Sequence, residues 1–104
     1  MTTPEQLVNQ IRTATDYQIN KQILREKVQT DLHFAYNGGL FKATPELIGF
    51  ISAWGAETLY LEDTYQNPIE VKRDEMISLC MNHYQMVMNA WHLEHEQLKS
   101  IRKI

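Results

Sequence analysis

The sequence predicts a small α+β domain in which two long helices, one at each end of the chain, pack side by side. Residues 5–36 and 73–104 contain neither proline nor glycine, and their apolar residues recur at the three- and four-residue spacing of a helix face. Between these stretches, shorter segments alternate apolar and polar residues around turn-forming residues, a pattern typical of β-hairpins. We therefore expect a single domain over residues 1–104, with a short middle helix and one or two β-hairpins.

The first helix is expected over residues 4–31. Thr3 can accept a hydrogen bond from the first turn, Pro4 suits the first helical position, and Gln6 completes a capping box. The apolar face is thin between residues 13 and 18, where polar and small side chains interrupt it. The helix is thus predicted to have one buried face that weakens in the middle.

The segment after the first helix allows two structures. A two-residue turn at Asn37 and Gly38 would form a hairpin that places Phe34 opposite Phe41. Alternatively, the first helix could continue to Tyr36 and stop at a left-handed residue. The sequence favours the hairpin.

A short helix and a second hairpin are predicted for the middle of the chain. Thr44 and Pro45 repeat the pattern of a capping residue followed by proline, and they begin a helix expected over residues 45–54. Residues 59–62 and 69–72 alternate apolar and polar residues on either side of a turn cluster. The buried face of this hairpin should consist of Leu59, Leu61, Ile69 and Val71.

The last helix, expected from about residue 73 to residue 104, carries the most regular pattern in the chain. One core position of a heptad repeat holds Ile77, Tyr84, Trp91 and Leu98, and the other holds Cys80, Val87 and Ile101. Glu94 alone breaks the repeat. We expect Tyr84 and Trp91 to be the largest buried side chains on this face.

A second apolar row lies on another side of the same helix. Leu79, Met86 and Leu93 repeat every seven residues, flanked by Met76 and Ala90. The first helix can cover only one of the two apolar sides. The other side must be covered by the hairpins or by a partner, because exposed apolar patches usually mark binding sites.

Helix length points to the same conclusion. A helix of about 30 residues is about 45 Å long, whereas a compact domain of this size is only about 33 Å across. The last helix must therefore overhang the body, fray, kink or pack against another chain.

Size, charge and composition exclude several classes of protein. The chain has 104 residues, of which 43% are hydrophobic and 22% charged, as in ordinary globular domains. Its net charge of −3 argues against an electrostatic nucleic-acid binder. Neither an apolar run of membrane-spanning length nor a signal-peptide pattern is found. The single cysteine, Cys80, excludes an internal disulfide and suits a reducing compartment.

No catalytic constellation is expected. His92, His95 and Glu96 could share a helix face, but their order is not that of a zinc protease and no fourth ligand lies nearby in the sequence. Cys80 lies on the apolar seam, where a thiol is unreactive. We therefore expect no enzyme activity, no metal and no cofactor.

Three stretches together resemble a known group of proteins. They are residues 32–48 (LHFAYNGGLFKATPELI), residues 67–73 and residues 91–103. They resemble small accessory or structural proteins encoded by contractile-tailed phages that infect marine cyanobacteria. The resemblance implies a virion or assembly component, or a factor that binds a host or phage protein, and it supplies no functional residues.

The sequence thus favours a non-catalytic protein–protein interaction or structural component, acting as a homo-oligomer or within a larger phage assembly. Such a protein would lie in the cytoplasm of an infected bacterium or in the virion, without binding a membrane or nucleic acid. The alternative is a small regulatory factor that binds a polymerase or another nucleic-acid machine. The candidate partner-binding residues are Leu79, Met86, Leu93, Leu98 and Ile101.

Overall fold

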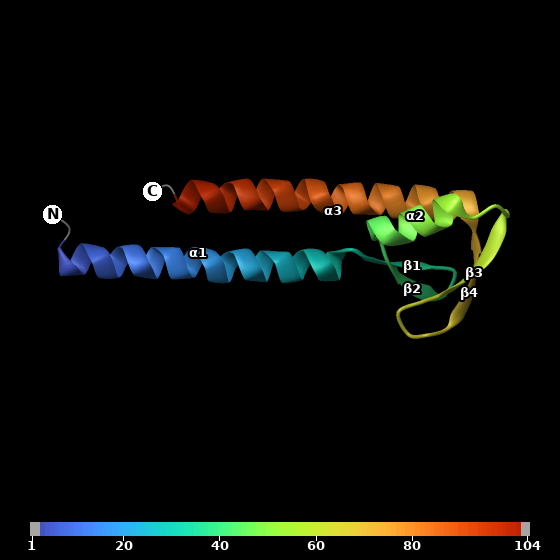
Figure 1. Cartoon of the computed structure of the whole chain (residues 1–104), viewed down its shortest axis with the longest axis horizontal. Coiled ribbons are helices and arrows are strands. Elements are labelled where there is room, and N and C mark those ends of the chain that lie inside the picture. The colour runs from blue at the N-terminus through green and yellow to red at the C-terminus, as the bar shows by residue number, and fades with distance from the viewer. Residues whose placement is uncertain (1–2, 103–104) are drawn as a thin grey trace.

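The protein consists of a small α+β head and a long two-helix stalk (Figure 1). The computed structural model describes residues 3–102, and of residues 11–14, 101 and 102 it describes the backbone alone. In chain order the elements are α1 (Pro4–Asp31), β1 (His33–Tyr36), β2 (Gly39–Lys42), α2 (Pro45–Ala53), β3 (Thr58–Glu62), β4 (Pro68–Lys72) and α3 (Arg73–Arg102). The predicted α+β class and the two long packed helices are confirmed.

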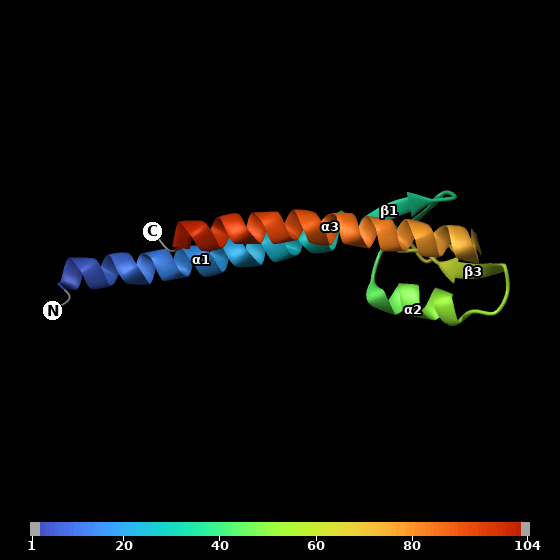
Figure 2. The ribbon, with the colours of Figure 1, turned by 90° about the horizontal axis from the view of Figure 1, so that it is seen from above.

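The shape differs from the compact body that we assumed from chain length. The molecule measures 67 × 22 × 19 Å, and its radius of gyration is 19.8 Å, against about 13 Å for a compact domain of 100 residues. The head comprises the two hairpins, α2 and the first turns of α3. The stalk is the antiparallel pair formed by α1 and the rest of α3, and the start of α1 projects past the end of α3 (Figures 1 and 2).

The start of α1 follows from its capping residues. The N–H of Gln6 donates to Thr3 Oγ1 at 3.1 Å, and the N–H of Thr3 donates to Gln6 Oε1 at 3.1 Å. This reciprocal pair satisfies donors that the helix itself cannot, and Pro4 removes another. The predicted capping box and the predicted bounds of the helix are both confirmed.

The first hairpin, β1–β2, is present, so the alternative of a longer first helix is wrong. Asn37 and Gly38 have φ angles of 47° and 83°, the left-handed conformation that a tight two-residue hairpin turn needs at both positions. The register places Phe34 opposite Phe41 as predicted. The N–H of Ala43 donates to the carbonyl of Leu32 at 2.9 Å, which extends the pairing to the end of α1.

Helix α2 begins where the sequence predicts and ends one residue earlier. Thr44 Oγ1 accepts from the N–H of Leu47 at 3.1 Å. Ile51 is fully buried. Trp54, the last residue of the expected helix, is instead its C-cap residue and is 42% exposed.

The second hairpin, β3–β4, is present and has the predicted buried face. Leu59 pairs with Val71 and Leu61 with Ile69. Leu59 and Val71 are buried. Leu61 and Ile69 are half-buried against the same core.

The head core is built around the first turns of α3. Met76 and Cys80 are fully buried there and pack with side chains from both hairpins and α2. The core residues are Phe41, Ile51, Leu59, Val71, Met76 and Cys80. We had expected Met76 to flank the second apolar row of α3. It belongs to the head core instead. Figure 2 shows α2 and the β1–β2 hairpin on opposite sides of α3.

Asp63, in the turn between β3 and β4, is a buried carboxylate that joins two parts of the head. It is 6% exposed. Its Oδ1 accepts from the N–H groups of Tyr65 at 3.0 Å and Asn67 at 2.8 Å, and its Oδ2 accepts from the N–H of Leu40 at 3.1 Å. These hydrogen bonds, led by that from Asn67, hold the pKa of Asp63 below its usual value of 3.8, while burial acts in the opposite direction.

The seam of the stalk is narrow. Val28, Leu32 and Val87 are buried together, and Tyr84 and Met88 pack against them. Further along α1, Tyr17 and Leu24 are also buried. Trp91 is 38% exposed, so the prediction that it is one of the largest buried side chains is wrong. With only two helices in the stalk, a large side chain at the edge of the seam has no third element to cover it.

We expect Asp63→Asn to lower the thermal midpoint of unfolding at neutral pH, because the amide cannot accept at both positions and leaves a buried N–H unpaired. The folded-state pKa of Asp63 is depressed, so its contribution is complete above the unfolded-state pKa of about 3.9 and is lost as the pH falls through the folded value. The midpoint difference between wild type and variant, measured by circular dichroism, should therefore be full at pH 6 and shrink as the pH falls below about 4.

Glu62→Gln is the matched control for this measurement, since Glu62 immediately precedes Asp63 and its carboxylate is exposed. It should leave the midpoint unchanged across the same pH range. A loss of stability in Asp63→Asn that persists undiminished at low pH would contradict the role assigned to the carboxylate.

Candidate interaction surface

The row of apolar residues on the second side of α3 is open to solvent. Leu79, Met86 and Leu93 are 41%, 59% and 64% exposed, and their spacing of seven residues places them along one side of the helix. We call these three residues the α3 stripe. The hairpins do not cover it, because their inward side chains pack on Met76 and Cys80 instead.

The stripe lies within an uncharged part of α3. Residues 76–93 contain no Asp, Glu, Lys or Arg, and they include four of the five methionines of the chain. In ordinary soluble domains, about 25% of all residues are charged. The buried centre of a protein–protein interface, in contrast, is depleted of charge and enriched in methionine and aromatic residues. The absence of charged residues from this segment is evident in the sequence, but we did not use it to predict the surface.

Helix α1 also carries an exposed apolar residue near its ion pair with α3. Lys27 Nζ contacts Glu94 Oε1 at 2.8 Å and so marks one edge of the seam. The hydrogen bond to Glu94, reinforced by charge attraction, raises the pKa of Lys27. Ile23 precedes Lys27 by about one helical turn and therefore shares its side of α1. Ile23 is 57% exposed, and we place it beside the Leu93 end of the α3 stripe.

The opposite side of the stalk has a different character. A groove of about 290 Å³ lies there, lined by Lys21, Arg25, Val28, Gln29, Met88, Trp91 and His95. The rings of Trp91 and His95 stack with their centroids 5.4 Å apart. Two cationic side chains border this groove, whereas the α3 stripe has none within its own span of α3. The two sides of the stalk would therefore favour different partners.

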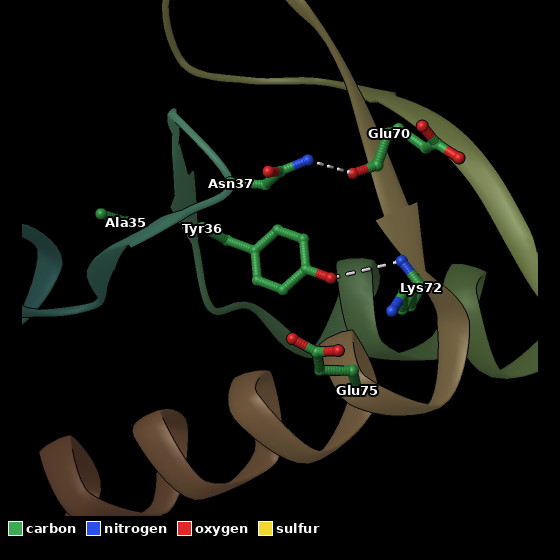
Figure 3. A pocket seen from close by; sticks show the side chains of 6 residues that line it. All are labelled: Ala35, Tyr36, Asn37, Glu70, Lys72 and Glu75. Atoms are coloured by element: carbon green, nitrogen blue, oxygen red, sulfur yellow. Dashed lines mark hydrogen bonds between the residues drawn. The ribbon is translucent and has the colours of Figure 1, made fainter.

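The head contains a polar pocket of about 450 Å³ (Figure 3). It is lined by Ala35, Tyr36, Asn37, Glu70, Lys72 and Glu75. Asn37 Nδ2 donates to the carbonyl of Glu70 at 3.1 Å, and the N–H of Lys72 donates to Tyr36 Oη at 3.3 Å. Figure 3 shows the side chains of Tyr36 and Asn37 reaching from the first hairpin to β4. These polar groups connect the two hairpins, and we assign the pocket a structural role.

The hairpins also meet closely at Gly39. A Cβ atom at this position would lie 2.7 Å from Ile69 Cγ1, which is too close for two carbon atoms that are not bonded to each other. Gly39 is therefore required by the packing of one hairpin on the other. The pocket lies beside this contact, which fits its assignment to the internal structure of the head.

The remaining candidate residues are not gathered into a site. His92 is exposed, His95 faces Trp91, and Glu96 lies 3.5 Å from Lys99. Within the described residues, no group of three His, Cys, Asp or Glu side chains could hold a metal ion. Leu98 is half-buried. The side chain of Ile101 lies outside the described part of the chain.

Cys80 occupies the junction between the head core and the seam. Its side chain is fully buried, and burial raises the pKa of its thiol to about 11. The predicted core position of this cysteine is confirmed.

Comparison of the chain with protein-family models, with curated proteins and with solved structures finds no match. Over residues 3–102, no helix combines the length and the apolar character that crossing a membrane requires. The exposed surface is therefore the feature that bears on function.

We expect Cys80 to resist alkylation by iodoacetamide at pH 9 in the native protein and to react readily in guanidinium chloride. Its raised pKa keeps the thiol protonated, and only the thiolate reacts. Ser78→Cys supplies a matched control, because Ser78 is an exposed residue of the same helix. The new thiol should be alkylated under native conditions. Equal native reaction rates at both positions, measured by mass spectrometry, would show that Cys80 is accessible.

Proposed function

We propose that this chain is a non-catalytic structural component of a larger assembly and that it binds another protein chain through the α3 stripe. The observation that carries the proposal is the combination of three exposed apolar side chains in one row with a segment that lacks charge. An exposed row of apolar side chains of this kind is costly to leave in water and often marks an interaction site.

The resemblance to accessory proteins of contractile-tailed phages suggests which assembly this is. We propose a phage particle, or an intermediate of its assembly, in an infected bacterium. A small regulator of a polymerase or another nucleic-acid machine is the alternative, and it could use the same surface. The two functions differ in what the chain should accompany during purification.

The test compares affinity-tagged wild type with a variant carrying Leu79→Gln, Met86→Gln and Leu93→Gln, each produced during infection. We expect wild type to co-sediment with purified particles or their assembly intermediates and the variant to be depleted by about tenfold or more. Burying a Leu or Met side chain contributes about 1.5–3 kcal/mol, and about 1.4 kcal/mol corresponds to a factor of ten. Quantitative mass spectrometry measures the ratio.

The control variant carries Val8→Gln, Met81→Gln and Phe50→Gln, which replace three apolar residues of similar exposure elsewhere on the molecule. It should co-sediment like wild type. Both triple variants should keep the wild-type circular dichroism spectrum, since all six side chains are exposed. Absence of wild type from particles and intermediates overturns the phage assignment, and recovery with a polymerase instead would select the regulatory alternative.

A further inference from the structure

The surface area of the chain suggests how much of it a partner should cover. The accessible surface is 7775 Å², whereas a compact monomer of 12.2 kDa exposes about 6,000 Å². The chain thus exposes roughly 1,700 Å² more than a compact protein of its mass. A stable dimer needs about 800 Å² from each partner. The excess is large enough for a full protein–protein interface on each copy.

The origin of this extra accessible surface suggests what the partner is. It arises because only two helices lie side by side in the stalk of a molecule 67 Å long and about 20 Å wide. A third helix packed along α3 would cover apolar side chains that α1 leaves exposed. The α3 helix of a second copy of this chain would be such a helix.

The arrangement of the α3 stripe is itself symmetric. Met86 lies midway between Leu79 and Leu93, seven residues from each. If two copies of α3 pair antiparallel about an axis near Met86, Leu79 of each copy meets Leu93 of the other. A face that matches itself in this way is what a two-fold interface requires.

The chemistry of the segment permits this pairing. Because residues 76–93 carry no charged side chain, no like charges are brought together at the axis. Met86 at the centre has a flexible, unbranched side chain that adapts to contact with its own copy. Ile23 of α1 would extend the contact beside Leu93.

We infer that the α3 stripe binds a second copy of this chain, with the two α3 helices antiparallel about Met86, so that the first half of α3 in each copy lies beside the stalk of the other. This inference rests on the proposed function in assuming that the stripe binds protein, and it names the partner.

Charge placed at the axis tests the inference. Wild type should have a mass of about 24 kDa by light scattering, twice the 12.2 kDa of one chain. Met86→Lys and Met86→Glu should each give the mass of one chain, because the two-fold axis brings two like charges together. An equal mixture of the two variants should regain the double mass. Met81→Lys, at a similarly exposed position of α3, should behave as wild type.

The direction of pairing is tested by cross-linking. Leu79→Cys and Leu93→Cys chains should form a disulfide when mixed and oxidised, and neither should do so alone. In the antiparallel pair the two copies of residue 79 lie about 21 Å apart along the helices, too far for a bond that needs Cα atoms within about 7 Å. Wild type, whose Cys80 is buried, is the control.

Each outcome separates this inference from the proposed function. A folded wild-type monomer at micromolar concentration overturns the second copy as partner, and the proposed function survives if that monomer still co-sediments with particles. Failure of the Lys and Glu variants to restore each other, or disulfides between two Leu79→Cys chains, overturns the antiparallel arrangement. A dimer that passes both tests but accompanies no larger assembly supports the inference and contradicts the proposed function.

Discussion

Helix α3 runs without interruption for 30 residues, a length of about 45 Å, and this continuity determines the rest of the structure. Its first turns supply Met76 and Cys80 to the head core. The same helix then continues past the head, where only α1 remains to cover it. Because neither proline nor glycine occurs between residues 73 and 104, the helix has no residue at which it could readily turn back and fold against the head. The elongated stalk is a direct consequence.

The head, in turn, depends on a few polar contacts between its two hairpins. Each hairpin has only two strands, and an isolated two-stranded hairpin is marginally stable at best. Asp63 accepts hydrogen bonds both from its own turn and from Leu40 of the other hairpin. Tyr36 and Asn37 make the reverse connection to β4. Together with the close contact at Gly39, these bonds hold the hairpins in the position from which they cover α3.

The elements that the sequence predicted well are those set by short-range rules. The start of α1 depends on Thr3, Pro4 and Gln6, and the first hairpin depends on the left-handed turn at Asn37 and Gly38; both signals lie within a few residues. The role of Asp63 was not predictable in this way, because its partner Leu40 is 23 residues away. The heptad repeat predicted Trp91 to be buried in the seam, whereas Trp91 lines the groove beside it and is 38% exposed. Its exposure depends on the absence of a third helix beside the described stalk, which a repeat within one helix cannot indicate.

The candidate surface was predicted in part. The spacing of Leu79, Met86 and Leu93 identified the row, and their exposure shows that it is open. Whether the hairpins covered the row could not be decided from the sequence, since Leu59 and Val71 could have packed on either side of α3. The uncharged segment from 76 to 93 was the stronger signal, because it marks the part of the helix that lacks charged side chains whatever the fold.

Glu94 is a charged residue at a core position of the heptad, and it lies where the uncharged segment of α3 ends. Glu94 is the one failure of the heptad, and it is the acceptor of the ion pair with Lys27. An exposed ion pair of this kind adds little stability, but a polar residue at a core position can specify the register of two helices. It also ends the uncharged segment, while Asp74 and Glu75 precede its beginning. The apolar row is therefore bounded by charge at both ends. A bounded face that matches itself is used up by one further copy, so it favours a closed pair over an open-ended filament.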